Sequence, residues 1–241
     1  YRQVLQQAAQ QRALAPEGHP QLVRLRQVAQ RIIPHSYEWN PRAKTWKWEV
    51  NLLGNKQINA WCMPGGKIAF YTGILETLKL TDEEVAAVMG HEVAHGALQH
   101  IVQANLNREL LVSDLKKIQA EIDEMNRQYA AGHMPAYVYQ SRKQFVLSRM
   151  GELQTRLDRL ESQEKFAKEL SHESEIEADL VGLRYVVGAG YSADGLATAL
   201  EKLRQRGIKM FGKDFTGGGK SHPALSLRIT LLSKAQSRLS P

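Results

Sequence analysis

Hydrophobic residues recur at helical spacing in the first 33 residues of the chain and again in several stretches after residue 82. Residues 2–33 predict two helices separated by the Pro- and Gly-containing segment 15–20. The second helix places its apolar residues on one face, at Leu22, Leu25, Val28, Ala29 and Ile32. Such a stripe is typical of a helix that packs against a core.

The pattern changes to strict alternation from Trp46 onward, which is typical of β-strands with one buried face. Apolar residues alternate with other residues in two runs, at Trp46, Trp48, Val50 and Leu52, and at Ile58, Ala60 and Cys62. A turn predicted at Gly54-Asn55 would join these runs as a β-hairpin. The turn residues 64–66 lead into a third extended run, 67–71, and a short helix is expected to begin at Thr72.

A seven-residue hydrophobic repeat fills two stretches on either side of the breaker at residues 131–135. Its members are Leu111, Leu115, Ile118, Ile122, Met125 and Tyr129, and then Tyr139, Val146, Met150, Leu153, Leu157 and Leu160. Folding one stretch onto the other pairs these positions at nearly constant sums of residue numbers, which indicates an antiparallel, coiled-coil helical hairpin. We expect residues 104–168 to form this hairpin as an insertion within a single domain of residues 1–241. It could serve as a stabilising buttress, or as a substrate gate, docking arm or dimer contact.

The stretch that follows Thr81 carries the chemistry. Thr81 and Glu84 form the sequence signature of a capping box, so a helix is expected to begin there. His91 and His95 lie four residues apart and therefore share a face of this helix, where both imidazoles can bind one metal ion. Glu92 lies beside them, within reach of a water held by that metal. This is the HExxH arrangement of zinc hydrolases.

A tetrahedral zinc site with an open position needs a third protein ligand. Glu175 and Asp179 are four residues apart, and Ala178 leaves room for the two helices to approach. We expect Glu175 to bind the metal and Asp179 to accept a hydrogen bond from a ligand histidine. The neighbouring Glu173 and Glu177 would then point elsewhere.

Three further residues are candidates for the site by residue type. His100 and His172 are alternative metal ligands, although His100 would need an unusual reach from the same helix. Arg228 is a candidate for neutralising an oxyanion and a better one for a structural ion pair. Sequence alone leaves these alternatives open.

Composition limits the class of protein. With 241 residues and 43% hydrophobic residues the chain can bury a core, and no apolar run of 18 residues occurs. We expect soluble behaviour, because the chain opens on a polar, Gln-rich helix without a signal-peptide core. The single Cys62 excludes an internal disulfide and fits a buried strand position. The net charge of +7 comes from basic residues interspersed with acidic ones, so we expect a solvated surface with a mild preference for acidic neighbours, and no nucleic-acid partner.

Four motifs in order resemble the HtpX and CAAX-prenyl-protease type of gluzincin metallopeptidase, particularly its soluble bacterial periplasmic members. They are INAWCMPGGKIAFYTGIL, HEVAH, ESEIEAD and SHPALSLRI, and the likeness covers most of residues 20–235. The resemblance implies an α+β, mainly α, zincin-like fold with a small three-stranded sheet beside the HExxH helix. It implies one Zn²⁺ bound by His91, His95 and Glu175, with Glu92 as general base. Asp179 matches an aspartate that is sometimes assigned a proton-donor role, although geometry favours a role behind a ligand histidine.

The resemblance also bears on His222, which follows the Gly-rich residues 217–219. In this family the equivalent loop lies near the active site, so His222 could stabilise the tetrahedral intermediate or occupy the open metal position. A cap on the last helix is the alternative. The chain departs from the family in the separation of His95 and Glu175, which are 80 positions apart because of the hairpin, and in lacking the relatives' transmembrane helices.

These observations predict a zinc-dependent endopeptidase that acts on unfolded or misassembled proteins. The resemblance alone implies a location in the periplasm or envelope, where the expected role is envelope protein quality control, and association with a membrane surface is a further expectation. The strands before the HExxH helix could supply an edge to which an extended substrate adds, or form a sheet with a covered edge. One alternative is a zinc-containing, chaperone-like protein that binds clients through the hairpin. Another is a latent protease gated by His222 or the hairpin.

Overall fold

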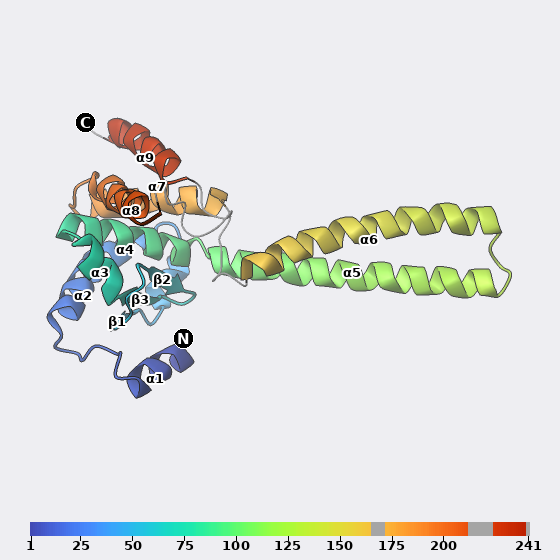
Figure 1. Cartoon of the computed structure of the whole chain (residues 1–241), viewed down its shortest axis with the longest axis horizontal. Helices are drawn as coiled ribbons and strands as arrows, with labels where there is room; N and C mark the ends of the chain where they lie inside the picture. Colours follow the sequence, from blue (N-terminus) through green and yellow to red (C-terminus); the bar gives the residue numbers. More distant parts are fainter. Residues whose placement is uncertain (165–171, 212–223, 240–241) are drawn as a thin grey trace. The chain divides into compact units, whose positions relative to one another are not determined.

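The computed structural model describes residues 1–164, 172–211 and 224–239, and the chain divides into two compact units (Figure 1). Unit 1 comprises Tyr1–Ile101 and Leu170–Pro241, and unit 2 comprises Val102–Glu169. His222 lies outside the described residues. None of the described helices combines the length and hydropathy that crossing a membrane requires.

The two N-terminal helices form as predicted. Helix α1 spans Arg2–Gln10 and α2 spans Pro20–Ile32, and α2 buries the face that carries the apolar stripe. Pro20 occupies the first turn of α2, and Nδ1 of His19 accepts a hydrogen bond from the Gln21 amide at 3.2 Å. Two short 3-10 turns, η1 (Ile33–Tyr37) and η2 (Pro41–Thr45), then lead to the sheet.

The sheet has three strands, but the predicted hairpin between its first two strands is wrong. Strands β1 (Glu49–Leu53), β2 (Ala60–Met63) and β3 (Lys67–Tyr71) lie in the order β1-β3-β2. β1 pairs with β3 in parallel, whereas β2 and β3 form the antiparallel pair. The tight turn lies at Gly65 and Gly66, whose φ angles of 80° and 78° suit glycine, while the amide of Gly54 is held by the carbonyl of Ala13 at 2.6 Å.

The two faces of the sheet have different covers. Val50, Leu52, Ile68 and Phe70 belong to the main core together with residues of α2 and α4. Leu53 and Ala69 instead pack with Ala8 of α1, and the ring of Trp61 meets that of Tyr1 edge-on at 6.0 Å. Alternation along the strands therefore serves the main core on one face and a second, smaller core on the other, rather than one core and solvent.

Helix α3 (Thr72–Leu78) connects the sheet to α4 (Asp82–Ala97), which is buried on nearly all sides. The capping box is confirmed: the Thr81 amide donates to Glu84 Oε2 at 2.8 Å and the Glu84 amide to Thr81 Oγ1 at 3.3 Å. At the other end, buried Asn40 donates from Nδ2 to the carbonyl of Ala97 at 2.9 Å. Both ends of α4 are thus held.

The C-terminal helices of unit 1 cover α4 on the side away from the sheet (Figure 1). They are α7 (His172–Gly188), α8 (Gly195–Phe211) and α9 (Leu225–Leu239). α7 and α8 contact α4 directly, and α9 packs on α7 and α8. The fully buried Ala178, together with Gly90 and Gly182, allows α4 and α7 to lie close together.

Unit 2 contains most of the two long helices α5 (His100–Ala130) and α6 (Ala136–Glu164). The rings of Tyr129 and Tyr139 stack with centroids 4.2 Å apart at 10°. Further along both helices Ile118, Ile122 and Val146 form a buried cluster with Met150 and Leu153 against it. Because the end of α5 meets the start of α6, the helices run antiparallel. The predicted contribution of Leu160 lies outside the described side chains.

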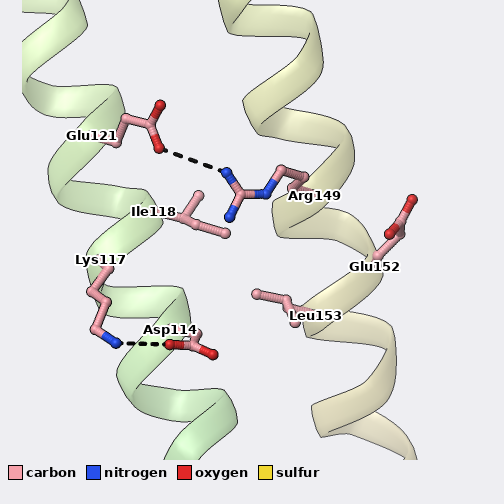
Figure 2. Close-up of a pocket in the computed structure, with 7 residues that line it drawn as sticks. All are labelled: Asp114, Lys117, Ile118, Glu121, Arg149, Glu152 and Leu153. Carbon is pink, nitrogen blue, oxygen red and sulfur yellow. Dashed lines mark hydrogen bonds and ion pairs between the residues drawn. The ribbon is translucent and has the colours of Figure 1, made fainter.

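A pocket of about 310 Å³ lies between α5 and α6 (Figure 2). Ile118 and Leu153 face each other across it, and charged residues surround them, namely Asp114, Lys117, Glu121, Arg149 and Glu152. Two ion pairs lie among these charges, since Lys117 Nζ lies 2.9 Å from Asp114 Oδ1 and Arg149 Nη1 lies 3.9 Å from Glu121 Oε2.

Candidate metal centre

Helices α4 and α7 bring two histidines and one glutamate to a common point in unit 1. His91 and His95 lie one turn apart on α4, and Glu175 lies in the first turn of α7. All three are buried, with exposed fractions of 8%, 4% and 4%. One donor atom from each lies within 4.8 Å of the others, as expected for a group that could hold a metal ion.

The distances between the donor atoms fit a tetrahedral ion. Bonds of about 2.0–2.2 Å from zinc to nitrogen or oxygen place neighbouring ligand atoms about 3.3–3.6 Å apart. Nε2 of His91 lies 3.0 Å from Nε2 of His95, and Nε2 of His95 lies 3.4 Å from Glu175 Oε1. Nε2 of His91 lies 3.7 Å from Glu175 Oε2. Two imidazoles and one carboxylate at these separations match the donor set of a zinc site with an open position.

Asp179 and Arg228 support the outer side of His91. Nδ1 of His91 lies 2.8 Å from Oδ1 of Asp179, one turn beyond Glu175 on α7. Arg228 of α9 donates to both oxygens of Asp179 at 2.7 Å, and its Nη1 lies 3.2 Å from Glu175 Oε2. This fork places Arg228 in a buried ion pair that joins both carboxylates. Asp179 thereby favours the tautomer of His91 that leaves Nε2 free for a metal.

His100 and Glu177 support the outer side of His95 in the same way. Nδ1 of His95 lies 2.9 Å from Nδ1 of His100, and Nε2 of His100 lies 3.3 Å from Glu177 Oε2. If Nε2 of His95 binds a metal, its Nδ1 carries the proton and donates to His100. His100 then carries its own proton on Nε2 and donates to Glu177. One set of neutral tautomers therefore gives every ring nitrogen of His95 and His100 a partner.

Glu92 lies between the metal ligands and strand β2. Burial raises the pKa of Glu92 to about 7; the nearby His91 opposes this rise and Glu175 adds to it. The backbone amide of Cys62 is among the groups that stabilise the charged form of the Glu92 carboxylate and lower its pKa. A carboxylate with a pKa near neutrality is suited to accept and return a proton.

The protonation of the histidines follows from their surroundings in the metal-free site. Burial and the neighbouring His91 lower the pKa of His95 to about 4, so it is neutral and able to bind metal at pH 7. Burial lowers the pKa of His91, but Asp179 and Glu175 outweigh this and the net shift is upward. Burial would raise the pKa of Asp179, yet Arg228 and His91 hold it below its usual range.

The remaining sequence candidates lie elsewhere. His172 begins α7 and is exposed, as is Glu173, and neither belongs to the group that could hold a metal. His100 contacts a candidate ligand and does not itself join that group. Sequence reasoning missed the contact between His100 and Glu177, because it depends on a turn in which Gln99 has a φ of 57°. The one signal was a third histidine, five residues after His95.

Comparison with known proteins finds similar metallopeptidases. The chain is 30% identical to the mitochondrial metalloendopeptidase OMA1 of Arabidopsis thaliana over 188 residues, which cover 78% of this chain and 31% of that protein. It is 32% identical to the metalloprotease LoiP of Escherichia coli (strain K12) over 186 residues, covering 71% of this chain and 62% of that protein. The chain thus spans less than two thirds of the length of either relative.

The model of peptidase family M48 matches residues 21–236, a span that includes α2, the sheet, α4 with its two histidines, and α7 with Glu175. This match covers most of the 241 residues. The chain therefore belongs to peptidase family M48.

Proposed function

We propose that this chain is a zinc-dependent endopeptidase, with His91, His95 and Glu175 as the metal ligands and Glu92 as the general base. The observation that carries the proposal is the convergence of the three donor atoms beside a carboxylate whose pKa is raised to about 7. Membership of family M48 and the two metalloprotease relatives support it. Two nitrogen donors and one oxygen donor in tetrahedral spacing favour zinc among the common metals.

The chain's own residues account for the proton transfers of peptide hydrolysis. When bound, zinc polarises the scissile carbonyl and lowers the pKa of water in the site. Glu92 takes the proton from the attacking water and passes it to the leaving amine. The Cys62 backbone amide stabilises the charged form of Glu92, which is the form that accepts the proton. Asp179 and His100 hold the two ligand imidazoles in their metal-binding tautomers.

Strand β2 supplies a place for an extended substrate. The amide of Tyr71 donates to the carbonyl of Asn59 at 3.1 Å, which makes these two residues a hydrogen-bonded antiparallel pair. Pairs alternate along the ladder, so the backbone groups of Ala60 and Cys62 point away from β3. β2 lies at the end of the sheet in the described residues. A substrate strand added at this edge would run past Glu92 and the metal ligands.

The proposal extends to the setting of the enzyme. We place the activity in envelope protein quality control, on unfolded or misassembled substrates, in the periplasm or at a membrane surface. Resemblance to the soluble periplasmic members of the HtpX type supports this setting. Residues 104–168 are proposed to be a coiled-coil hairpin inserted into one peptidase domain, in keeping with the separate unit 2.

Cleavage of an unfolded casein tests the proposal, with metal content measured on the same samples. The wild-type chain is expected to contain one zinc per chain, to cleave casein, and to lose activity in the presence of a chelator. Glu92→Gln should retain zinc and lose at least about 100-fold in rate, because the base is removed and the ligands remain. Glu175→Ala should lose the metal. Activity that survives in Glu92→Gln would remove this residue from the mechanism.

A further inference from the structure

The end of the helical hairpin in unit 2 carries basic residues without acidic ones. We define the tip segment as residues 125–151, which comprise the end of α5, the connecting turn and the start of α6. It contains Arg127, Arg142, Lys143 and Arg149 and no aspartate or glutamate. Acidic residues begin again on either side, at Glu124 and Glu152. Interspersion of opposite charges, which holds for the chain as a whole, therefore fails in this segment.

The tip segment also exposes large apolar side chains. Tyr137 is 78% exposed and Phe145 is 65% exposed, and both belong to α6. Leu147 and Tyr129 are 46% and 41% exposed. Tyr137 and Phe145 cost solubility without belonging to the buried clusters between α5 and α6, which include Tyr139 and Val146.

Two aromatic and two basic residues share one side of α6. At 3.6 residues per turn, Tyr137, Phe145, Arg149 and Arg142 fall within an arc of about 140°. Tyr139 and Val146, which face α5, fall outside this arc. Arg149 also lies over the ring of Phe145, with its guanidinium carbon 5.9 Å from the ring centroid. The outward side of α6 is therefore amphipathic, with apolar rings beside cationic heads.

The basic charge of the tip segment is only partly neutralised within the chain. Arg127 pairs with Glu124 at 2.7 Å, and Arg149 lies 3.9 Å from Glu121. Lys143 donates to the hydroxyl of Tyr139 at 2.9 Å, which leaves its charge in place. Among the described residues neither Arg142 nor Lys143 forms an ion pair. A cationic surface with exposed rings is thus left facing solvent.

We infer that the tip segment is a docking site for an anionic phospholipid surface. Exposed tyrosine and phenylalanine are suited to the boundary between headgroups and acyl chains, and neighbouring arginine and lysine are attracted to anionic headgroups. A single-stranded nucleic acid would use rings on a basic groove that follows its backbone, whereas these rings stand on the outward side of a helix. The inference goes beyond the proposed peptidase activity and does not require it.

Co-sedimentation of the full 241-residue chain with vesicles tests this site. Vesicles of phosphatidylcholine alone are compared with vesicles containing 30% phosphatidylglycerol, at low and at physiological salt. We expect binding to the anionic vesicles that weakens with salt, and little binding to the neutral ones. The assay does not depend on peptide hydrolysis, so a negative result would reject this inference and leave the proposed peptidase function untouched.

Two sets of variants locate the site, one for the basic residues and one for the aromatic residues, each with a control outside the tip segment. Arg142→Glu is expected to weaken vesicle binding roughly 30-fold and Arg142→Gln roughly fivefold, since each basic residue adds a similar increment near a charged membrane. Lys116→Glu makes the same charge change at an exposed position of α5 outside the tip segment and should have a much smaller effect. Tyr137→Ser with Phe145→Ser should weaken binding several-fold, whereas Leu106→Ser with Leu110→Ser, at exposed residues outside the tip, should not.

Circular dichroism confirms that each variant retains its helices. Equal binding to neutral and anionic vesicles would overturn the inference, as would equal losses in the tip variants and their controls. A single-stranded oligonucleotide that displaces the chain from vesicles at physiological salt, and binds more tightly than they do, would assign the tip to nucleic acid instead.

Discussion

Gly90 of α4 and Gly182 of α7 face each other, and a β-carbon on Gly182 would lie 2.8 Å from the carbonyl carbon of Gly90 and from the amide nitrogen of His91. A β-carbon on Gly90 would lie 2.9 Å from the carbonyl oxygen of Gly182. The two backbones are therefore closer than residues with side chains permit. Because His91 and Glu175 belong to these helices, this crossing sets the spacing between the metal ligands.

Replacing Gly182 with alanine should separate α4 and α7. We expect Gly182→Ala to lower the free energy of unfolding by about 1–3 kcal/mol, as overpacking does, and to weaken metal binding at the same time. Gly151→Ala is the matched control, since Gly151 lies in α6 and no atom lies within 4 Å of its added β-carbon. It should stabilise the chain by up to about 1 kcal/mol. Thermal unfolding and competition with a zinc chelator measure both effects, and wild-type metal affinity in Gly182→Ala would contradict this role of the crossing.

His100 should act by orienting His95. We expect His100→Ala to weaken metal binding about 10- to 100-fold, because Nδ1 of His95 loses its acceptor. His100→Asn should recover part of this loss, since its side-chain amide can take the place of Nδ1. The absorption spectrum of the cobalt-substituted protein reports the ligand geometry and should change in the alanine variant. An unchanged spectrum and affinity in His100→Ala would assign His100 to packing alone.

Asp179 should contribute to stability through Arg228 and to metal binding through His91, and the two contributions can be measured separately. Asp179→Asn is expected to cost about 3–5 kcal/mol of stability, because Arg228 loses the charge that its fork binds. The double variant Asp179→Leu with Arg228→Met replaces the buried pair by apolar side chains and should regain most of that stability. Its metal affinity should nevertheless stay below that of the wild type, since Nδ1 of His91 has no acceptor in this variant. Urea unfolding and metal titration distinguish the two parts, and normal metal affinity in the double variant would count against Asp179 as an orienting residue.

Local patterns predicted much of unit 1, since the signals lie close together in the chain. The capping box at Thr81 and Glu84 and the spacing of His91 and His95 each involve one helix, and the structure contains both. Glu175 was predicted from spacing within its own helix and from family resemblance. The sheet order was not predictable, because alternation shows that a segment is a strand and does not show its neighbour. Turns were expected both at Gly54-Asn55 and at residues 64–66, and only the second joins an antiparallel pair of strands, with positive φ angles at Gly65 and Gly66.

Contacts that depend on how helices cross, or on an unusual backbone turn, could not be predicted from the sequence. The pairing of Asp179 with Arg228 joins residues 49 positions apart, so residue type suggested an ion pair without naming the partner. The contact between His95 and His100 required a left-handed turn at Gln99, a residue type with no strong preference for it. His222 lies outside the described residues, and its role as a gate stays a prediction.

Glu84 should make stability depend on pH away from the metal site. Burial alone would raise its pKa, but the Lys202 ammonium at 2.6 Å and the Thr81 amide hold the pKa of Glu84 below its ordinary value of 4.5. The folded state therefore binds the proton less readily than the unfolded state. The resulting stabilisation is fully present above pH 4.5 and is lost as the pH falls through the folded pKa.

Glu84→Gln should therefore destabilise the chain most at neutral pH, by about 1–3 kcal/mol, which is typical of a lost charge-assisted hydrogen bond. Urea unfolding of the metal-free protein between pH 7 and pH 3 measures the difference from wild type, and that difference should shrink below pH 4.5. Glu76→Gln removes an exposed carboxylate on α3 and should leave stability nearly unchanged at every pH. A difference between wild type and Glu84→Gln that grows as the pH falls would mean that burial, rather than Lys202, governs this carboxylate.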